Sequence, residues 1–136
     1  MKQVDVTIIG AGPVGLFAAF YAGMRGMSVR IVDSLPELGG QLTALYPEKY
    51  VFDMPGFPKV LAKDLAAQMA EQALQFEPEL VLEDTAEHLD AGVDGYVVRT
   101  RKGLELPTKT LIISAGAGAF SPTKVGVERE AELEGK

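Results

Sequence analysis

The pattern of apolar and polar positions changes along the chain, and its first part, residues 6–32, is the most informative about the fold. Two short apolar runs, residues 6–9 and 29–32, flank an apolar, alanine-rich segment at residues 13–25. Short runs bounded by breakers predict strands, and the longer segment between them predicts a helix. Residues 59–76 then repeat apolar side chains every three to four positions, which predicts an amphipathic helix that packs on a core and ends before Pro78.

The rhythm changes to short strand patterns after this helix. An apolar run, Leu80–Leu82, opens a stretch in which turn sequences at residues 91–95 and 102–103 separate further strand-like runs. Strand patterns that alternate with glycine-containing turns favour hairpins. We therefore expect residues 79–106 to form a small antiparallel meander.

A late apolar run, Leu111–Ile113, has the composition of a fully buried strand and ends in a sharp turn at residues 114–118. If this strand lies parallel to the first one, both of the turns that follow them meet at the carboxyl edge of the sheet. The patterns together predict an α/β fold of the Rossmann type. Its parallel sheet begins with a βαβ unit and is followed by an amphipathic crossover helix and the antiparallel meander.

The turn after the first apolar run carries the most specific chemistry. Gly10, Gly12 and Gly15 follow the GxGxxG spacing of dinucleotide-binding turns, and Asp33 closes the second apolar run. Gly10 allows a sharp exit from the strand, Gly12 lets backbone approach a pyrophosphate, and Gly15 lets the helix pack close to the sheet. Pro13 suits the first helical position, where its missing N–H has no partner to lose. Asp33 can accept hydrogen bonds from the hydroxyls of an adenosine ribose.

Two irregular segments follow Asp33. The loop at residues 34–41 lies beside the nucleotide in such a fold, so Gly40 can bring backbone against a ligand and Gln41 can offer its amide. An ordinary surface turn is the alternative. Residues 42–58 are too rich in proline for a long helix, and their aromatic side chains, Tyr46 among them, fit either a stacked ligand ring or a core.

Composition narrows the function. The chain has 136 residues, is 47% hydrophobic and 24% charged, and carries a net charge of −6, which disfavours nucleic acid and anionic membrane surfaces as partners. It contains no cysteine, so disulfides, thiolate metal sites and dithiol centres are excluded within these residues. His88 is the single histidine, and we expect no metal site. The uncharged stretch at residues 6–24 could suggest a membrane segment, but Pro13 and the nucleotide-loop glycines argue against it.

These motifs resemble one family. The opening GAGPVGLFAAFYAGMRG, the loop SLPELGGQL, the segment ALYPEKYVFDMPGFPKVLAKDL and the late IISAGAGAFSP look like the thioredoxin-reductase-like ferredoxin (flavodoxin)–NADP reductases. The resemblance covers about the first 125 residues. The glycine fingerprint is shared by many NAD and FAD proteins, whereas GGQL together with YPEKY is much more specific to this branch.

The resemblance implies an FAD-binding domain with particular contacts. It places Gln41 near the flavin and pyrophosphate, Tyr46 against the isoalloxazine, the backbone of Ala86 at the adenine, and Phe120 at a further cofactor contact. The cofactor-binding residues that we expect are Gly10, Gly12, Pro13, Gly15, Asp33, Gly40, Gln41, Tyr46, Ala86, Gly116 and Phe120.

The family's chemistry is hydride transfer from NADPH to FAD, followed by single-electron delivery to ferredoxin or flavodoxin. The protein holds the flavin and tunes it, so no side chain is expected to act as acid, base or nucleophile. The resemblance also implies a homodimer, and the composition suits a cytoplasmic protein.

The length departs from the family, whose members are well over twice this size. Their NADPH-binding domain is inserted after a segment that matches residues 121–136. We therefore expect an FAD-binding domain at residues 1–120, a linker at residues 121–136, and no NADPH site in this chain. An N-terminal part of the reductase should leave a parallel sheet edge uncovered, bind FAD weakly if at all, and show no NADPH-dependent turnover.

Other functions remain open on the sequence. The FAD domain of a low-molecular-weight thioredoxin reductase fits as well, since its dithiol lies in the NADPH domain. A nucleotide-binding module without catalysis is a second alternative. A plain NAD domain is disfavoured by the meander, and glutathione-reductase-like enzymes are disfavoured because no cysteine follows Gly40.

Overall fold

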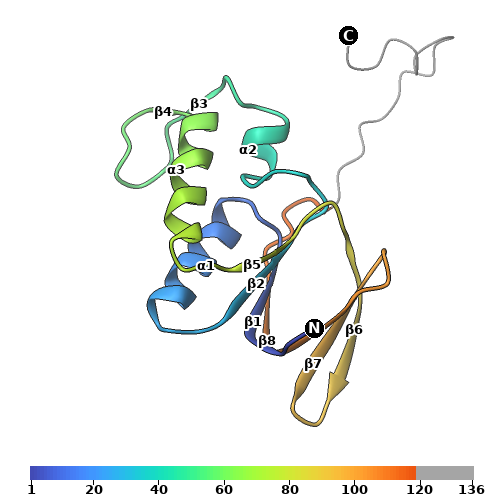
Figure 1. Ribbon diagram of the computed structural model, residues 1–136. Coiled ribbons are helices and arrows are strands. Elements are labelled where there is room, and N and C mark those ends of the chain that lie inside the picture. Colours follow the sequence, from blue (N-terminus) through green and yellow to red (C-terminus); the bar gives the residue numbers. More distant parts are fainter. Residues whose placement is uncertain (119–136) are drawn as a thin grey trace, which may run out of the picture.

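The computed structural model describes residues 1–118 (Figure 1). The contact expected at Phe120 and the linker expected at residues 121–136 lie outside the described residues. The elements are β1 (Val4–Ile9), α1 (Pro13–Met24), β2 (Val29–Val32), α2 (Gln41–Ala44), β3 (Tyr50–Val51), β4 (Val60–Leu61), α3 (Ala62–Leu74), β5 (Glu79–Val81), β6 (Ala86–Gly92), β7 (Gly95–Thr100) and β8 (Glu105–Ile113).

A six-stranded sheet organises the molecule, with strand order β5-β2-β1-β8-β7-β6. Strands β5, β2, β1 and β8 are parallel, whereas β8, β7 and β6 pair antiparallel. The Rossmann-like prediction is confirmed in this layout. Strands β3 and β4 form a separate two-stranded sheet, so the proline-rich segment contains no long helix, as expected.

Strand β8 joins the two halves of the sheet. Its first residues, Glu105–Thr108, pair with β7, and its later residues pair with β1 up to the match of Ile113 with Ile9. The Ser114 amide continues this ladder by donating to the Ile9 carbonyl at 2.8 Å. The turn after β8 therefore lies beside the glycine turn after β1, as the sequence predicts.

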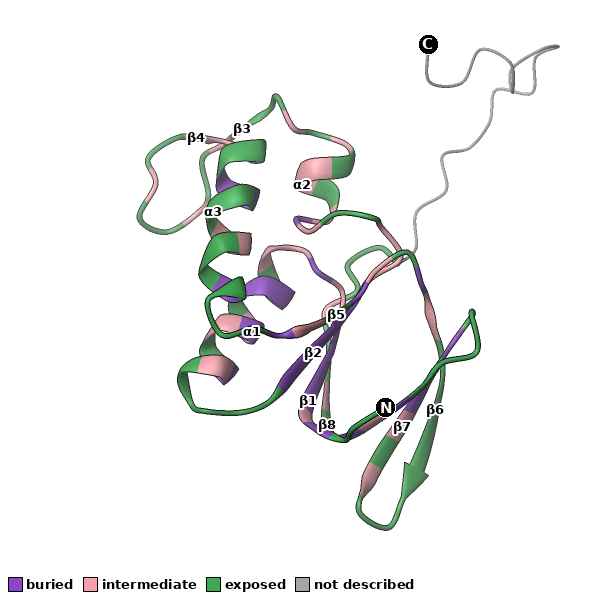
Figure 2. Ribbon diagram, in the orientation of Figure 1, coloured by how far each residue is buried: buried purple, intermediate pink, exposed green. Residues whose placement is uncertain are grey.

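Two apolar cores lie on opposite faces of the parallel strands. Helices α1 and α3 cover one face, where Ile8, Leu16 and Ile31 are completely buried (Figure 2). The meander folds toward the other face, where Val32 and Leu106 belong to the second cluster of buried side chains. The parallel strands are thus covered by helices on one face and by side chains of the antiparallel part of the same sheet on the other.

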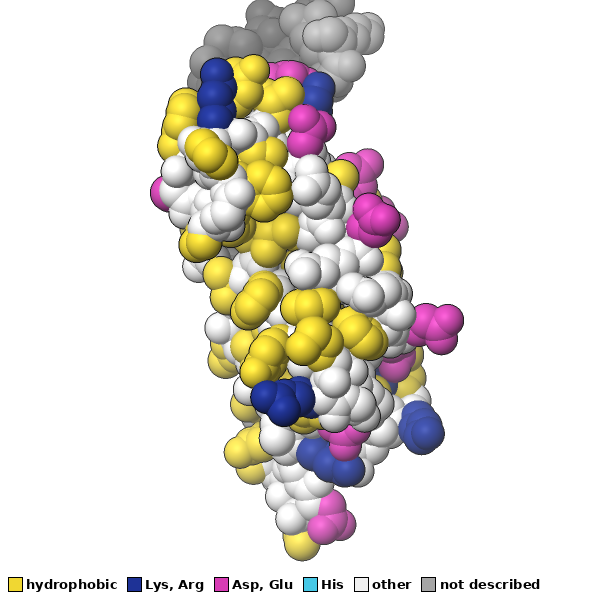
Figure 3. All heavy atoms as spheres, turned by 90° about the vertical axis from the view of Figure 1, so that its left-hand side faces the viewer, with side chains coloured by type: hydrophobic (Ala, Val, Ile, Leu, Met, Phe, Trp, Pro, Cys, Tyr) yellow, Lys and Arg dark blue, Asp and Glu magenta, His cyan; other side chains and the backbone are white. Residues whose placement is uncertain are grey.

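Helix α1 also has an outward apolar stripe. Val14, Phe17, Tyr21 and Met24 follow helical spacing and are each about half exposed or more. Figure 3 shows apolar side chains gathered on this helical side of the molecule. The helix is therefore apolar nearly all round, which explains why its sequence lacks a clear polar face. No helix among residues 1–118 has the length and apolarity needed to cross a membrane.

Two sequence predictions about strands are wrong in part. The run around Leu80 does not open the meander: β5 instead pairs parallel to β2, because α3 crosses back over the sheet to start a new parallel strand. The run Leu111–Ile113 is a strand but is not buried, since Ile112 is 38% and Ile113 72% exposed. Within residues 1–118 this part of β8 pairs only with β1, so its other edge is uncovered.

Arg30 is an unexpected part of the interior. It lies in the middle of an apolar run, yet its side chain is fully buried. Its guanidinium donates to the Pro107 carbonyl at 3.0 Å, to the Lys2 carbonyl at 2.8 Å and to the Glu79 carboxylate at 2.8 Å. One arginine thereby ties β2 to the segment before β1, to the start of β5 and to the amino-terminal part of β8.

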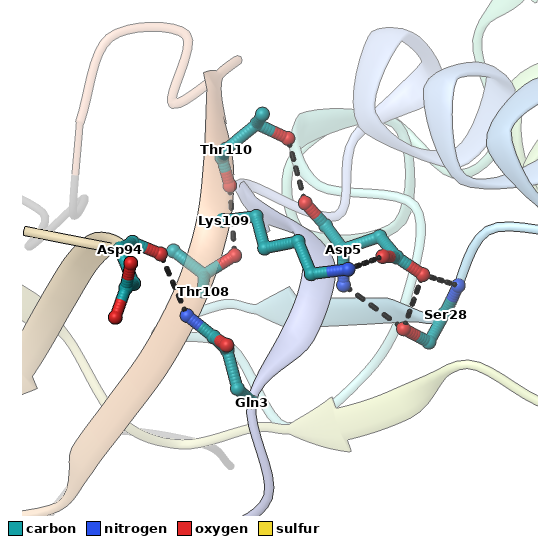
Figure 4. Close-up of polar contacts among 7 residues, drawn as sticks. All are labelled: Gln3, Asp5, Ser28, Asp94, Thr108, Lys109 and Thr110. Carbon is teal, nitrogen blue, oxygen red and sulfur yellow. Dashed lines mark hydrogen bonds and ion pairs between the residues drawn. The ribbon is translucent and has the colours of Figure 1, made fainter.

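The amino ends of β1 and β2 are joined by side chains (Figure 4). The Asp5 carboxylate accepts from the Ser28 amide at 2.8 Å, from the Ser28 hydroxyl at 2.7 Å and from the Lys109 ammonium at 2.7 Å. The Thr110 hydroxyl donates to the Asp5 carbonyl at 2.7 Å. The hydrogen bonds from Lys109 and Ser28 hold the pKa of the Asp5 carboxyl well below its usual range.

Candidate functional site

The glycine turn is shaped by close backbone contacts. Gly10 has a φ of +105°, and a Cβ there would lie 2.4 Å from the Ser114 carbonyl oxygen. A Cβ on Gly15 would lie 1.8 Å from the Gly10 carbonyl oxygen, so this helical position lies directly against the turn. A side chain at either position would push α1 and β8 away from β1.

The N-terminus of α1, in contrast to Gly10 and Gly15, has free space around it. Gly12 is the N-cap, Pro13 occupies the first helical turn, and a Cβ on Gly12 would meet nothing within 4 Å. With no capping side chain, the first-turn N–H groups of α1 are available to an anion, and the helix dipole favours negative charge there. The geometry matches a pyrophosphate-binding helix start.

Asp33 lies where the second-strand acid is expected. One of its carboxylate oxygens accepts from the Ala11 amide at 2.5 Å, and the other accepts from the Leu35 amide at 2.9 Å. The carboxylate therefore fastens the glycine turn to the loop after β2. Each oxygen can accept a further hydrogen bond, which leaves capacity for ribose hydroxyls.

The second glycine pair packs on the first turn. The Gly39 amide donates to the Ala11 carbonyl at 2.8 Å, and a Cβ on Gly40 would lie 2.9 Å from the Gly12 Cα. Gly40 is the N-cap of α2, so Gln41 is the first residue of that one-turn helix and lies close to the glycine turn. These contacts place the loop after β2 against the glycine turn, and the expectation that the loop lies beside a bound nucleotide stays a prediction.

These turns surround a cavity of about 710 Å³ at the carboxyl end of the parallel strands. Its walls come from the glycine turn, the loop after β2, the start of α2, the loop between β5 and β6, and the turn after β8. The predicted residues that line it are Gly10, Gly12, Pro13, Asp33, Gly40, Gln41, Ala86 and Gly116. Segments far apart in the sequence are thus brought to one edge of the sheet.

Other predicted residues lie elsewhere. Gly15 is buried beneath the turn and does not line the cavity. Tyr46 is 47% exposed, and its ring lies 5.1 Å from the Lys49 ammonium, outside the cavity walls. Phe120 lies beyond the described residues. The expectation of ring stacking at Tyr46 therefore stays a prediction.

The cavity also contains residues that the sequence did not single out. Ser114 lines it, and the Ser114 hydroxyl lies 3.1 Å from the Ile9 carbonyl and 3.2 Å from the Gly10 carbonyl. Asp84 lines it from the loop between β5 and β6 and is almost completely buried. The position of Ser114 after an apolar strand was a usable signal, whereas no local pattern marks Asp84.

Asp84 is held as a carboxylate by its neighbours. Burial favours a higher pKa, but the nearby Thr100 hydroxyl and hydrogen bonds from the Lys102 and Thr85 amides outweigh it and lower the pKa of Asp84. The group therefore stays ionised near neutral pH, next to the cavity wall.

The arrangement suits binding more than side-chain catalysis. The cavity offers backbone N–H groups, a helix start and carboxylates, which together fit a pyrophosphate and a ribose. Within residues 1–118, no group of three or more His, Asp and Glu side chains is placed to hold a metal ion.

Known proteins resemble this chain throughout its length. A family model described as pyridine nucleotide-disulphide oxidoreductase matches residues 4–136. A ferredoxin–NADP reductase from Thermus thermophilus is 54% identical over 134 residues, which cover 98% of this chain and 40% of that protein. Ferredoxin–NADP reductase 2 from Shouchella clausii is 55% identical over 125 residues, covering 92% of this chain and 38% of that protein.

Solved structures give the same picture of the fold. Thioredoxin reductase from T. acidophilum superposes with a TM-score of 0.74 at 29% identity, covering 100% of this chain and 42% of that one. Thioredoxin reductase from Streptococcus pyogenes superposes with a TM-score of 0.74 at 27% identity, covering 92% of this chain and 38% of that one. The chain thus spans about two fifths of the length of its curated relatives.

Proposed function

The chain belongs to the pyridine nucleotide-disulphide oxidoreductase family, and we propose that it is the FAD-binding part of a flavoprotein reductase. In this proposal the whole protein takes electrons from NADPH and passes them through FAD to ferredoxin or flavodoxin. The chain resembles the N-terminal portion of ferredoxin–NADP reductases at about half identity. Its FAD-binding Rossmann-like fold is the one seen in the thioredoxin reductase structures.

The cavity at the carboxyl end of the parallel strands carries the proposal. A pyrophosphate fits above the open N-terminus of α1, where Gly12 has no Cβ to block it. The adenosine ribose then reaches Asp33, and the isoalloxazine extends toward Gln41 at the start of α2. The residues present fit FAD, because the spaces that a Cβ would fill lie where the diphosphate must approach.

FAD, when bound, supplies the hydride-accepting and electron-passing chemistry. The residues of this chain bind and orient it. The first turn of α1 neutralises the diphosphate, Asp33 fixes the ribose, and the paired glycine turns exclude side chains from the space between them. We propose no acid, base or nucleophile among residues 1–118.

The remaining parts of the proposal concern the whole protein. Residues 1–120 form the FAD-binding domain, and residues 121–136 lead toward an NADPH-binding domain. The whole protein acts in the cytoplasm as a homodimer. The FAD contacts of Tyr46 and Phe120 belong to this proposal as well.

A thioredoxin reductase is the second candidate, favoured by the solved structures with 27–29% identity. The curated relatives with 54–55% identity favour the ferredoxin type over it. A nucleotide-binding module without catalysis remains a third candidate, and NADPH oxidation by the whole protein with ferredoxin or thioredoxin as acceptor separates the three.

The absorption spectrum of the purified chain, before and after FAD is added and excess FAD removed, tests the proposal. We expect weak but saturable FAD uptake, visible as a bound oxidised flavin and as quenched flavin fluorescence. A chain that takes up no FAD would refute the function proposed for it. We expect no NADPH oxidation by the 136-residue chain, since its sequence holds one GxGxxG turn, and turnover at the rate of a complete reductase would contradict this.

A further inference from the structure

The loop between β5 and β6 contains the one buried carboxylate in residues 1–118. Asp84 is 3% exposed, and its Oδ2 atom is buried without a hydrogen-bond partner among those residues. A buried carboxylate destabilises a fold unless its neighbours compensate. Packing alone therefore does not explain why a carboxylate occupies this buried position at the cavity wall.

The contacts of Asp84 fasten two segments that come from different parts of the sheet. Its Oδ1 accepts from the Thr85 amide at 2.9 Å and from the Lys102 amide at 3.0 Å. The Thr85 carbonyl accepts in turn from the Arg101 amide at 2.8 Å. Thr85 is thus fixed through its N–H by Asp84 and through its C=O by Arg101, and Arg101 and Lys102 both lie in the turn between β7 and β8.

The same loop is also attached to the segment that carries Asp33. The Asp84 amide donates to the Asp33 carbonyl at 3.1 Å, and the Glu83 amide donates to the Leu35 carbonyl at 3.1 Å. If the diphosphate lies at α1 and the ribose at Asp33, the base attached to that ribose continues past Asp33. The next wall in that direction is formed by Asp84, Thr85 and Ala86.

We propose that Asp84 is a positioning residue for the adenosine end of the cavity, a proposal that rests on the proposed FAD-binding function. Its Oδ1 holds Thr85, and through it Ala86, as a fixed wall against the adenine base. The Asp84 side chain does not touch the ligand, because both of its oxygens are turned into the protein. Its effect on binding therefore passes through the backbone of the next two residues.

The test compares FAD and ADP binding by calorimetry for the wild-type chain and variants. Asp84→Ala leaves the Thr85 and Lys102 amides unpaired and loosens the wall, so FAD and ADP should both bind about tenfold more weakly. The stoichiometry should be unchanged, since the altered wall is local. Asp84→Asn keeps an acceptor oxygen at the Oδ1 position and should stay within about threefold of wild type.

Two further variants separate positioning from loss of the fold. Thr100→Val removes a hydroxyl that neighbours Asp84 without altering the cavity wall, and should weaken both ligands about twofold to threefold. Asp90→Ala removes an exposed carboxylate of the same meander and should bind like wild type. Gln41→Ala should weaken FAD and spare ADP, because Gln41 faces the flavin part of the ligand.

The outcomes are distinct. Asp84→Ala with wild-type affinity for both ligands overturns the positioning role and leaves the proposed function standing. A fall in stoichiometry at unchanged affinity, in Asp84→Ala and Thr100→Val alike, shows a purely structural role and also overturns it. A wild-type chain that binds neither FAD nor ADP refutes the proposed function, and the role of Asp84 with it.

Discussion

The two ends of the parallel strands differ in how neighbouring segments are held together. At the amino end, side chains bond to one another: Asp5, Ser28 and Lys109 form a compact polar cluster across β1, β2 and β8. At the carboxyl end, glycines bring backbone together and leave an open cavity of about 710 Å³. Side chains thus fill the amino end, whereas the carboxyl end keeps an open space where we propose that the ligand binds.

Gly15→Ala should give the largest effect of any single change at the carboxyl end. Its Cβ would lie 1.8 Å from the Gly10 carbonyl oxygen, and neither backbone segment can move without separating α1 from β1. We expect the free energy of unfolding to fall by roughly 3–5 kcal/mol and FAD uptake to be lost. Urea denaturation followed by circular dichroism measures the first, and flavin fluorescence the second. Unchanged stability would show that the turn is less rigid than its contacts indicate.

Arg30→Met should give the largest effect at the amino end. The fully buried guanidinium donates to Lys2, Pro107 and Glu79, and methionine leaves these acceptors without it. We expect a loss of about 2 kcal/mol in the free energy of unfolding, since Glu79 is partly solvated and can recover some hydration. FAD affinity of the folded protein should stay near that of wild type.

Arg101→Met is the matched control for Arg30→Met. Arg101 pairs with Glu87 on the surface of the meander, and its side chain is 66% exposed. Exposed ion pairs contribute little, so the stability should change by less than about 1 kcal/mol. Equal losses for both arginines would mean that the interior position of Arg30 is not what makes it stabilising.

Gly12→Ala should affect binding without affecting the fold. Gly12 has a φ of −72° and a ψ of −177°, which alanine adopts readily before Pro13, and a Cβ there meets nothing within 4 Å. Stability should stay within about 0.5 kcal/mol of wild type. If the diphosphate approaches this backbone, FAD affinity should fall about tenfold, or about 1.4 kcal/mol.

The pair Gly12→Ala and Gly15→Ala therefore separates the two uses of glycine in one turn. Thermal denaturation and FAD titration of both variants give the comparison directly. Wild-type FAD affinity in Gly12→Ala would place the diphosphate elsewhere in the cavity. A strong loss of stability in the same variant would mean that Gly12 is needed by the fold itself.

Much of this architecture follows from local patterns in the sequence. The apolar runs, the glycine spacing and Asp33 predicted β1, α1 and β2, because each of these depends on neighbouring residues. The short run at Leu80 predicted a strand but not its partner, since an apolar run does not state which edge it joins. Its pairing depends on where α3 returns the chain.

The parts of the candidate site that consist of glycine-containing backbone turns could be predicted from the sequence. A Cβ on Gly10 or Gly40 would clash with neighbouring backbone, and the glycines at these positions are visible in the sequence. Asp84 and Arg30 could not be found in this way, because their burial depends on partners such as Lys102 and Pro107 that lie far away in the chain. Charged residues are usually exposed, so the sequence alone predicts a surface position for such a residue. Its burial becomes evident only when the fold shows its hydrogen-bond partners.

Asp5→Asn should give the smallest effect and a characteristic pH dependence. Hydrogen bonds from Lys109 and Ser28 lower the pKa of Asp5 below its ordinary value of 3.8. A carboxyl with a lowered folded-state pKa stabilises the fold above its unfolded-state pKa, and this contribution is lost as the pH falls toward the folded-state value. The stability of wild type should therefore fall toward that of Asp5→Asn as the pH drops below about 4.

Because the pair with Lys109 is partly exposed, added salt should reduce the difference in unfolding free energy between wild type and Asp5→Asn at neutral pH. Urea denaturation at a series of pH values measures it, with Asp90→Asn as a control for an exposed ion pair outside the amino-end cluster. A difference that stays constant down to acid pH would show that the carboxylate charge of Asp5 does not stabilise the amino end, and that Ser28 and the backbone ladder hold it without that charge.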